Sequence, residues 1–545
     1  MADARKTSVL IAGGGPVGLV IAIELGRRGI DCVLVNDMPG TATHPKANAI
    51  GARSMEHFRR IGVAAPIRAA GLDDGHPTDV AYFTSLTGYE LARLHLPNRK
   101  EALAASRSGQ GPWGASPEPP HRCSQIFLER ALHARSVEFP TVTLRFGWRH
   151  LSFREEKDGV VGTVEDVATG QREDIHARFL IGCDGGASVV RRQLGIHYEG
   201  EHGISRPMMG GSMHSAYFRA RLDPSWLSVG RSWQYWCFNA DVRALIVHVD
   251  SHEHFLAQIR VPDGIDHRSV DSRALLHFAA RKDFPLEILS TQPWLAGHAL
   301  VAQSYGGGRV WLAGDSAHLF TPTGGLGMNT GVDDAVNLAW KLAAVIRGWG
   351  GPRLVPSYEA ERRPMGARNI AFARDYAISI GDVPITPEIE KDTAAGRAER
   401  AAVGPRLAEH AFREFVIPGV QLGLRYLDSP IIAPDGTTPP ADTPNIYTPS
   451  AAPGLRAPHL WLGEAALYDR LGLDFTLLRM GGADGAAIVA AAELRGMPLK
   501  ILDVPGARAL YEADLALIRP DQHVAWRGNA PPSDAVAFID RVRGA

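Results

Sequence analysis

Residues 7–29 of this 545-residue chain read TSVLIAGGGPVGLVIAIELGRRG, and they set the pattern for the N-terminal fold. The first six residues form a short apolar run that is typical of a fully buried strand. A cluster of glycines follows, and an amphipathic pattern then continues until Gly29. The stretch therefore predicts a buried strand, a tight turn and a helix that ends at about Arg28.

The predicted turn carries the motif G-x-G-x-x-G at Gly13, Gly15 and Gly18. In such a motif the first glycine permits the tight turn, the second lets a pyrophosphate approach the backbone, and the third lets the helix pack on the strand. Pro16 and Val17 begin the helix, whose free N–H groups attract phosphates. The strand, turn and helix context is the one that a dinucleotide site requires.

A second predicted strand, residues 31–35 (DCVLV), should end at a residue that binds the ribose hydroxyls. Asn36 stands at the expected position and Asp37 follows it. An amide hydrogen-bonds more weakly than a carboxylate does. The sequence leaves these two residues as alternatives for the ribose contact.

Two further predicted strands end in glycine and aspartate. Residues 178–183 (RFLIGC) lead into DGGASVVR, and residues 309–313 (RVWLA) lead into GDSAH. Residues 321–331 (TPTGGLGMNTG) and a long predicted helix come next. Three such motifs at the carboxyl ends of strands place one ligand along the edge of a parallel sheet.

These motifs resemble, in order and spacing, those of the class A flavoprotein monooxygenases, the superfamily of p-hydroxybenzoate hydroxylase and phenol hydroxylase. The family's third motif is G-D-A-A-H-x-x-P-P-x-G-G-x-G-x-N-x-G-x-x-D-A-x-N-L-x-W-K-L, and residues 314–342 here read GDSAHLFTPTGGLGMNTGVDDAVNLAWKL. The similarity continues through residues 421–437 (QLGLRYLDSPIIAPDGT), 456–462 (RAPHLWL) and 519–528 (RPDQHVAWRG). The similarity therefore covers most of the chain. The chain resembles 2,4-dichlorophenol monooxygenases and the tailoring hydroxylases of aromatic natural products.

The resemblance implies an α/β fold, mixed with α+β parts, in which a substrate sheet is inserted into a Rossmann-like FAD-binding domain and a thioredoxin-like domain follows. The expected divisions are an FAD-binding domain of residues 1–80, 116–205 and 295–400, a substrate-binding sheet domain of residues 81–115 and 206–294, a linker of residues 401–459, and a thioredoxin-like domain of residues 460–545.

The resemblance also assigns FAD contacts position by position. Gln125 matches the glutamine that contacts the flavin chain, and Lys46 keeps a positive charge where the family often has arginine. Asp315 matches the aspartate that binds the ribityl hydroxyls, while Asp184 and Arg191 belong to the motif that contacts both FAD and NADPH. The full set of expected cofactor contacts is Gly13, Gly15, Pro16, Val17, Gly18, Asn36, Asp37, Lys46, Gln125, Asp184, Arg191, Asp315, Pro322, Gly325, Gly327, Met328 and Asn329.

Pro322 matches the family proline beside the isoalloxazine edge and is a candidate catalytic residue as well as a cofactor contact, while Thr321 replaces a second proline common there. The resemblance also implies that the helix beginning near Asn329 directs its positive end toward the flavin N1–C2=O region, where reduced flavin is negatively charged.

The reaction that the resemblance implies uses FAD, NADPH (or NADH) and O2. The reduced flavin captures O2 as a C4a-hydroperoxide, whose distal oxygen is transferred to a phenolic or hydroxylated heteroaromatic ring. The alternatives are a Baeyer–Villiger or epoxidising monooxygenase on the same fold, and a non-catalytic FAD-binding interaction protein. A halogenase is disfavoured because residues 233–236 (WQYW) do not match W-x-W-x-I-P.

The substrate is expected under a sheet with strands near residues 212–220, 232–239 and 244–250, which are rich in alternating aromatic residues. A phenol needs its proton withdrawn to activate the ring. The candidates for that role are His214, Tyr217, Tyr235 and His248, and ordinary packing within the sheet is the alternative for each of them.

Composition excludes several other classes. The 58 basic and 59 acidic residues give a net charge of −1, which provides no electrostatic footprint for nucleic acid. The uncharged residues 8–23 are too short to span a membrane and contain Pro16, so we expect a cytoplasmic protein without a membrane span. The 4 cysteines form no C-x-x-C pair and predict no metal site. All of them precede the C-terminal domain, which excludes a redox role there and favours packing or a homo-oligomer interface.

Overall fold

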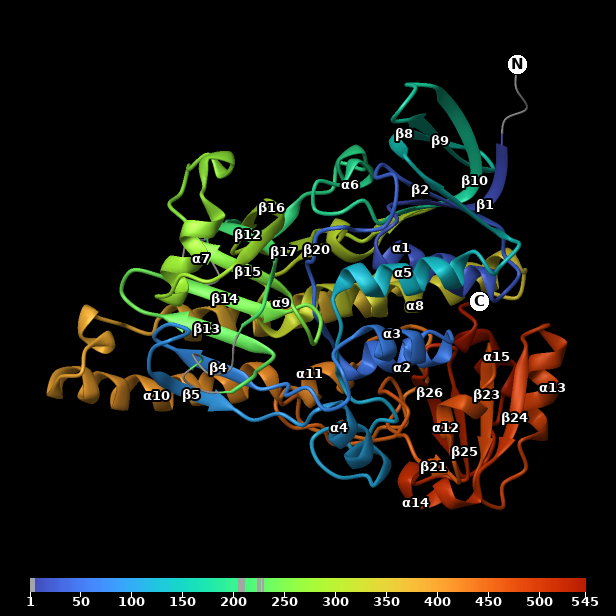
Figure 1. The fold of residues 1–545 in the computed structure, drawn as a ribbon. Helices are drawn as coiled ribbons and strands as arrows, with labels where there is room; N and C mark the ends of the chain where they lie inside the picture. Colours follow the sequence, from blue (N-terminus) through green and yellow to red (C-terminus); the bar gives the residue numbers. More distant parts are fainter. Residues whose placement is uncertain (1–4, 204–210, 223–226, 228–229) are drawn as a thin grey trace.

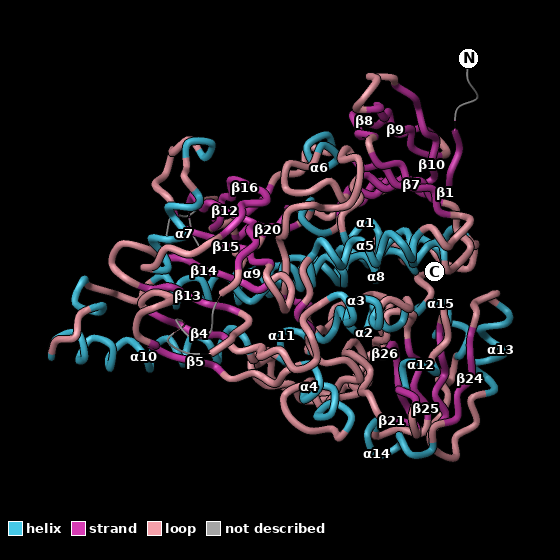
Figure 2. Tube along the Cα trace, in the orientation of Figure 1, coloured by secondary structure: helices cyan, strands magenta, loops and turns pink. Residues whose placement is uncertain are grey.

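The computed structural model describes residues 5–203, 211–222, 227 and 230–545. Its three largest sheets contain eight, seven and four strands. Figure 1 shows the eight-stranded sheet with its helices beside the N-terminus, the seven-stranded sheet at the opposite end, and the C-terminal unit below the helices. Figure 2 shows long loops that connect these parts.

The eight-stranded sheet is built around the N-terminal strand. β1 (Arg5–Ala12) lies between β10 (Arg172–Gly182) and β2 (Cys32–Asn36), and both pairings are parallel. β7 (Val142–Phe146) and β19 (Val310–Leu312) extend the parallel part on either side. The carboxyl ends of these strands therefore meet at one edge, as the three motifs predict. The antiparallel additions are β8 (Trp148–Glu156), β9 (Gly159–Asp166) and β18 (Gly306–Gly307).

Three helices cover one face of this sheet (Figure 1): α1 (Pro16–Gly26), α5 (Gln125–Ser136) and α8 (Leu326–Ile346). α1 is buried along nearly its whole length because it lies between the sheet and α8. A helix enclosed in this way is apolar on all sides. The predicted helix exists but ends at Gly26, two residues earlier than expected.

The seven-stranded sheet contains the expected aromatic strands and four others. Its order is β16 (Leu286–Ala296), β12 (Gly211–Ala220), β15 (His254–Arg260), β14 (Arg243–His248), β13 (Gln234–Phe238), β4 (Val80–Phe83) and β5 (Glu90–Leu94). β12, β13 and β14 lie where the sequence predicts strands. β4 joins β13 in a parallel pair, so a segment from far upstream completes the sheet.

The two faces of this sheet pack against different helices. The α7 face carries Tyr235 and Cys237, which pack against α7 (Ser272–Ala280). The α10 face carries Trp236 and Phe238, which pack against α9 (Ser357–Gly381) and α10 (Ala394–Phe415). Because side chains alternate along a strand, neighbouring aromatic residues of β13 face opposite sides.

The C-terminal unit is a four-stranded α/β sandwich. β23 (Phe475–Arg479), α13 (Ala486–Leu494) and β24 (Leu499–Asp503) form a parallel unit, and the hairpin β25 (Leu515–Ile518) and β26 (Val524–Gly528) completes the sheet. α15 (Ala535–Val542) packs against α13. This arrangement is the one expected of a thioredoxin-like domain. The exact domain boundaries given above stay predictions.

A buried cluster of charges joins the C-terminal hairpin to two long helices. The Glu361 carboxylate of α9 accepts hydrogen bonds from Lys341 Nζ of α8 at 2.6 Å and from both terminal nitrogens of Arg519 at 2.6 and 2.8 Å. All three side chains are fully buried. Arg519 also bonds to Asp521 at 2.6 Å.

The same hairpin reaches a third helix. The carbonyl oxygen of Asp521 accepts a hydrogen bond from Arg53 Nη2 at 2.6 Å, and Arg53 lies on α2 (Ala52–Arg60). Arg53 also pairs with Glu56 at 2.7 Å, and Glu56 in turn pairs with Arg456, which precedes the C-terminal sheet. The C-terminal unit is therefore held to the rest of the chain by ion pairs that water does not reach.

None of the helices within the described ranges combines the length and apolar character that a membrane crossing requires.

Replacing Arg519 with leucine should destabilise the fold strongly, because it leaves Glu361 and Asp521 buried with fewer positive partners. Removing one partner of a buried ion pair costs about 3–5 kcal/mol. The control is Arg479→Leu, whose pair with Asp503 lies on the exposed side of the same sheet. That change should cost about 1 kcal/mol or less. Urea unfolding followed by tryptophan fluorescence measures both, and equal losses would contradict the importance of the buried cluster.

Candidate functional site

The turn after β1 brings the backbones of two strands into direct contact. Gly13 has φ 115°, and a Cβ at this position would lie 2.1 Å from the carbonyl oxygen of Cys183, just after β10. A Cβ on Gly18 would lie 2.0 Å from the carbonyl oxygen of Gly13. A Cβ on Gly15, in contrast, would meet no atom within 4 Å. Two glycines of the motif thus serve backbone packing, and the middle one faces open space.

The start of α1 is suited to an anion. Gly15 is the N-cap residue of α1, and no side chain caps the helix. The first turn of a helix leaves amide N–H groups without intrahelical partners, and its end carries a partial positive charge. The open space at Gly15 lies beside these groups. This geometry fits a pyrophosphate at the expected position.

The two candidates for the ribose contact occupy different environments. The Asn36 side-chain oxygen accepts a hydrogen bond from the Gly14 amide at 3.0 Å, so Asn36 supports the glycine turn. Asp37 is exposed. Which of them binds a ribose stays a prediction.

The second motif forms a tightly bonded loop. Asp184 accepts hydrogen bonds from the Ser188 hydroxyl at 2.5 Å and the Val189 amide at 2.7 Å, and Ser188 is the N-cap residue of α6 (Val189–Gln193). Arg191 donates to the Gly186 carbonyl at 3.0 Å and lies 3.8 Å from the centre of the Tyr198 ring. Both residues shape the loop, and their contacts with FAD and NADPH stay predictions.

The third motif presents Asp315 at the strand end. Its side chain is exposed. Desolvation by the surrounding protein raises the pKa of the carboxyl group, and the charges of His318 and Lys46 oppose that rise. His318 is held by Asp334 at 2.7 Å, and Asp334 bonds to Arg362 at 2.8 Å. Sequence reasoning missed this buried chain, although His318 lies within the GDSAH motif.

The beginning of α8 is tied to the segment that carries Lys46. Asn329 donates to the Ala49 carbonyl at 3.0 Å and accepts from the Gly51 amide at 2.8 Å. The Gln125 side-chain oxygen accepts from the Ala47 amide at 3.3 Å, and the backbone amide of Gln125 donates to the Ala47 carbonyl at 2.7 Å. The predicted contacts Pro322, Gly325, Gly327 and Met328 lie in the turn η3 (Thr323–Gly325), its N-cap and the first residues of α8.

The motifs therefore converge at one edge of the parallel sheet, and comparison with known proteins agrees with them. Residues 6–373 match the family model described as FAD binding domain, and residues 450–545 match the model described as aromatic-ring hydroxylase, C-terminal. The chain belongs to the FAD-dependent aromatic-ring hydroxylases.

Sequence and structural similarity to individual proteins supports that assignment. The FAD-dependent monooxygenase apdD of Emericella nidulans is 31% identical over 98% of this chain and 89% of its own length. Phenol 2-monooxygenase of a Pseudomonas strain is 29% identical over 99% of this chain and 93% of its own length. The structure of RebC with bound 7-carboxy-K252c superposes with a TM-score of 0.89 at 36% identity, covering 99% of this chain and 100% of RebC.

The hydroxylase places the four candidate proton acceptors on different sides of the seven-stranded sheet. His214 Nε2 lies 2.7 Å from the Ser272 hydroxyl of α7, and the Tyr235 hydroxyl accepts from the Ser232 amide at 3.0 Å. His248 packs against Tyr235, and burial lowers its pKa to about 3. These three residues belong to the α7 face. Tyr217 lies on the other side of its strand, with its ring 6.5 Å from that of His44.

Sequence reasoning also missed His44. Its two ring nitrogens lie 2.9 Å from the Ser215 hydroxyl and 2.8 Å from the Ser290 hydroxyl, so it joins the Lys46 segment to β12 and β16. Burial lowers the pKa of His44 to about 4, which keeps it neutral near pH 7. The only signal in the sequence is its position two residues before Lys46.

Alanine substitutions should separate the roles of the three glycines. Gly13→Ala and Gly18→Ala force a Cβ against backbone oxygen, so each should destabilise the fold by about 1–3 kcal/mol whether or not FAD is present. Gly15→Ala should leave unfolding of the apoprotein nearly unchanged and weaken FAD binding at least roughly tenfold, because the added methyl group occupies phosphate space. Denaturation and FAD fluorescence titration measure these effects. If Gly15→Ala bound FAD with normal affinity, this result would contradict the placement of the pyrophosphate beside Gly15.

Proposed function

We propose that this hydroxylase inserts one oxygen atom from O2 into a phenolic or hydroxylated heteroaromatic ring, with NADPH (or NADH) as the reductant. The observation that carries the proposal is that the strand-end motifs meet at one edge of the parallel sheet and that the start of α8 is hydrogen-bonded to the segment that begins at Lys46. That segment continues into Ala49, which packs with the aromatic residues of the α10 face. FAD, when bound, supplies hydride acceptance from the reductant and the activation of O2.

The residues that hold FAD in this proposal are those of the three motifs. The amide groups at the start of α1 bind the pyrophosphate, and Asp315 binds hydroxyl groups of the ribityl chain. The turn before α8 approaches the ring with its backbone, and the positive end of α8 stabilises negative charge there. His318, Asp334 and Arg362 position the Asp315 loop through their buried bonds.

The α10 face of the seven-stranded sheet is a buried aromatic layer that packs against α9 and α10 beside the proposed substrate region. Trp236 stacks on Tyr82 with ring centres 5.7 Å apart and an interplanar angle of 22°. Trp233 meets Phe415 of α10 edge to face at 6.0 Å. A buried layer of this kind keeps water out from its side, which would protect a reactive oxygen species from solvent.

The proposal is tested by measuring NADPH oxidation by the holoenzyme against phenols and hydroxylated heteroaromatic compounds, with mass spectrometry of the products under isotopically labelled O2. The expected result is substrate-stimulated oxidation and one labelled oxygen on a ring carbon. Labelled oxygen next to a ketone or across a double bond would contradict ring hydroxylation. Failure of every compound to stimulate NADPH oxidation would favour a non-catalytic FAD-binding protein.

Asp315→Ala should weaken FAD binding by about 10–100-fold, because a charged hydrogen-bond acceptor is lost. The matched control is Asp375→Ala, which removes an exposed aspartate from α9. FAD retention during gel filtration and NADPH oxidation at saturating FAD distinguish the two. Equal FAD affinity in both variants would contradict a contact between Asp315 and the ribityl chain.

A further inference from the structure

Arg122 is a partly buried cation without an anionic partner. It lies on β6 (His121–Arg122), and its guanidinium group is 3.9 Å from the centre of the Trp233 ring. Within the described ranges of the chain, no hydrogen bond or ion pair engages this group. Burial lowers the pKa of Arg122 to about 9, so the group is still charged at neutral pH. Keeping a charge in such surroundings is costly unless an anion pairs with it.

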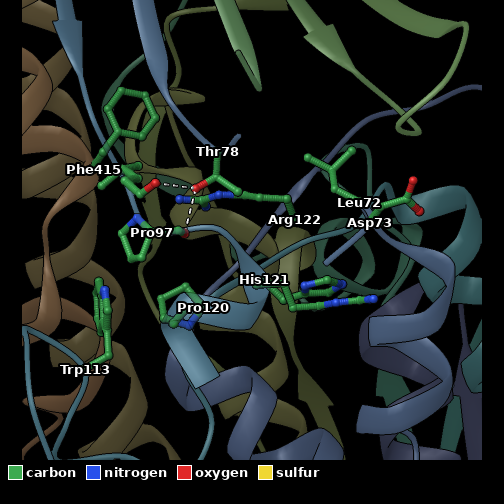
Figure 3. Close-up of a pocket in the computed structure, with 12 residues that line it drawn as sticks. Leu72, Asp73, Thr78, Pro97, Trp113, Pro120, His121, Arg122 and Phe415 are labelled. Atoms are coloured by element: carbon green, nitrogen blue, oxygen red, sulfur yellow. Dashed lines mark hydrogen bonds between the residues drawn. The ribbon is translucent and has the colours of Figure 1, made fainter. Parts of the chain in front are cut away.

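The guanidinium group lines a pocket with apolar and aromatic walls. Figure 3 shows Phe415 and Pro97 near the end of the Arg122 side chain, with Pro120 and Trp113 farther along the pocket. The nearby Asp73 carboxylate points away from that end (Figure 3). The second cation of the pocket, Arg99, is paired with Asp74. The pocket therefore contains one positive charge without an anionic partner, together with the aromatic rings of Phe415 and Trp113.

The other polar side chains of the pocket, Thr78 and His121, carry no negative charge. The Thr78 hydroxyl donates to the Pro97 carbonyl at 2.9 Å and lies 3.3 Å from the Leu96 carbonyl. Its proton is thus committed to the backbone. An anionic group in this pocket would be held by Arg122.

The pocket is close to the start of α8. Arg122 pairs with Ala49 across β6 and β3 (Ala49–Ile50), and the Ala49 carbonyl accepts the hydrogen bond from Asn329. A Cβ at Gly325 would lie 3.0 Å from the Ala49 Cβ. Trp233, over which Arg122 lies, precedes β13 and belongs to the wall of the α10 face. The pocket is therefore one strand away from the turn at which we place the flavin ring.

We propose that Arg122 binds the carboxylate of an aromatic-acid substrate, whose ring lies against Phe415 and Trp113. This inference rests on the proposed function, because that function places the reacting ring beside the start of α8. A planar guanidinium matches a carboxylate with two parallel hydrogen bonds, and Trp233 holds its plane from one side. A neutral phenol would pack against the same two aromatic rings but would leave Arg122 without an anionic partner.

The test uses isothermal titration of the oxidised holoenzyme without NADPH. The probes are two matched pairs, salicylate with salicylamide and gallate with gallamide. We expect each acid to bind at least about tenfold more tightly than its amide, since the hydrogen bond to a charged group is lost in the amide. Arg122→Gln should weaken acid binding about 10–100-fold and amide binding less than about threefold. Arg122→Lys should restore part of the preference for acids, because it keeps the charge but not the planar fork.

The control variant is Arg107→Gln, which removes a guanidinium 4.2 Å from the centre of the Trp461 ring, outside the pocket. It should leave the affinity for acids unchanged. Equal binding of acid and amide by the wild-type holoenzyme overturns the proposal, and so does an equal loss for both ligands in Arg122→Gln.

Product analysis separates this proposal from the function on which it rests. Hydroxylation of neutral phenols with no preference for acids supports the proposed function and overturns the role of Arg122. Arg122-dependent binding of acids that are never oxidised supports the role of Arg122 and contradicts hydroxylation of these acids.

Discussion

The carboxylate of Glu361 is the point at which the parts of this molecule are joined. It binds Lys341 of α8 and Arg519 of the C-terminal hairpin, and it belongs to α9 itself. α8 begins at the turn that carries the expected flavin contacts, and α9 continues to the α10 face of the seven-stranded sheet, where Ile380 packs. The geometry of the cofactor edge and of the seven-stranded sheet thus depends on one buried cluster of charges.

That cluster explains how the C-terminal unit is held to the rest of the chain. Burial raises the pKa of Glu361, but Arg519 and Lys341 outweigh this effect and hold the pKa at about 2. The carboxylate is therefore ionised under ordinary conditions and needs its partners. A buried charge whose partner is on another structural unit makes separation of the units costly. The cysteine-free thioredoxin-like unit accordingly acts here as a packing element for α8 and α9.

The sequence predicts the features that depend on local sterics and misses those that depend on long-range pairing. The roles of Gly13 and Gly18 follow from spacing alone, because a strand, turn and helix leave no room for Cβ atoms there. The orientation of Tyr235 and His248 was not predictable, because it depends on which face α7 covers. A shift of one residue along a strand reverses the face. The Arg519–Glu361 pair joins residues that are 158 positions apart, and the local sequence around either residue does not predict it.

The buried arginine side chains of this fold differ in whether a carboxylate of the same chain pairs with them. Arg362 and Arg519 are fully buried and bound by carboxylates from the same chain, so their desolvation is compensated in the folded protein. Arg122 shares their burial in part but has an indole ring in place of a carboxylate. A cation–π contact is worth about 0.5–2 kcal/mol, less than the penalty for desolvating an ion. An anion paired with Arg122 would offset the rest of that penalty, which is the physical basis for the carboxylate contact that we propose.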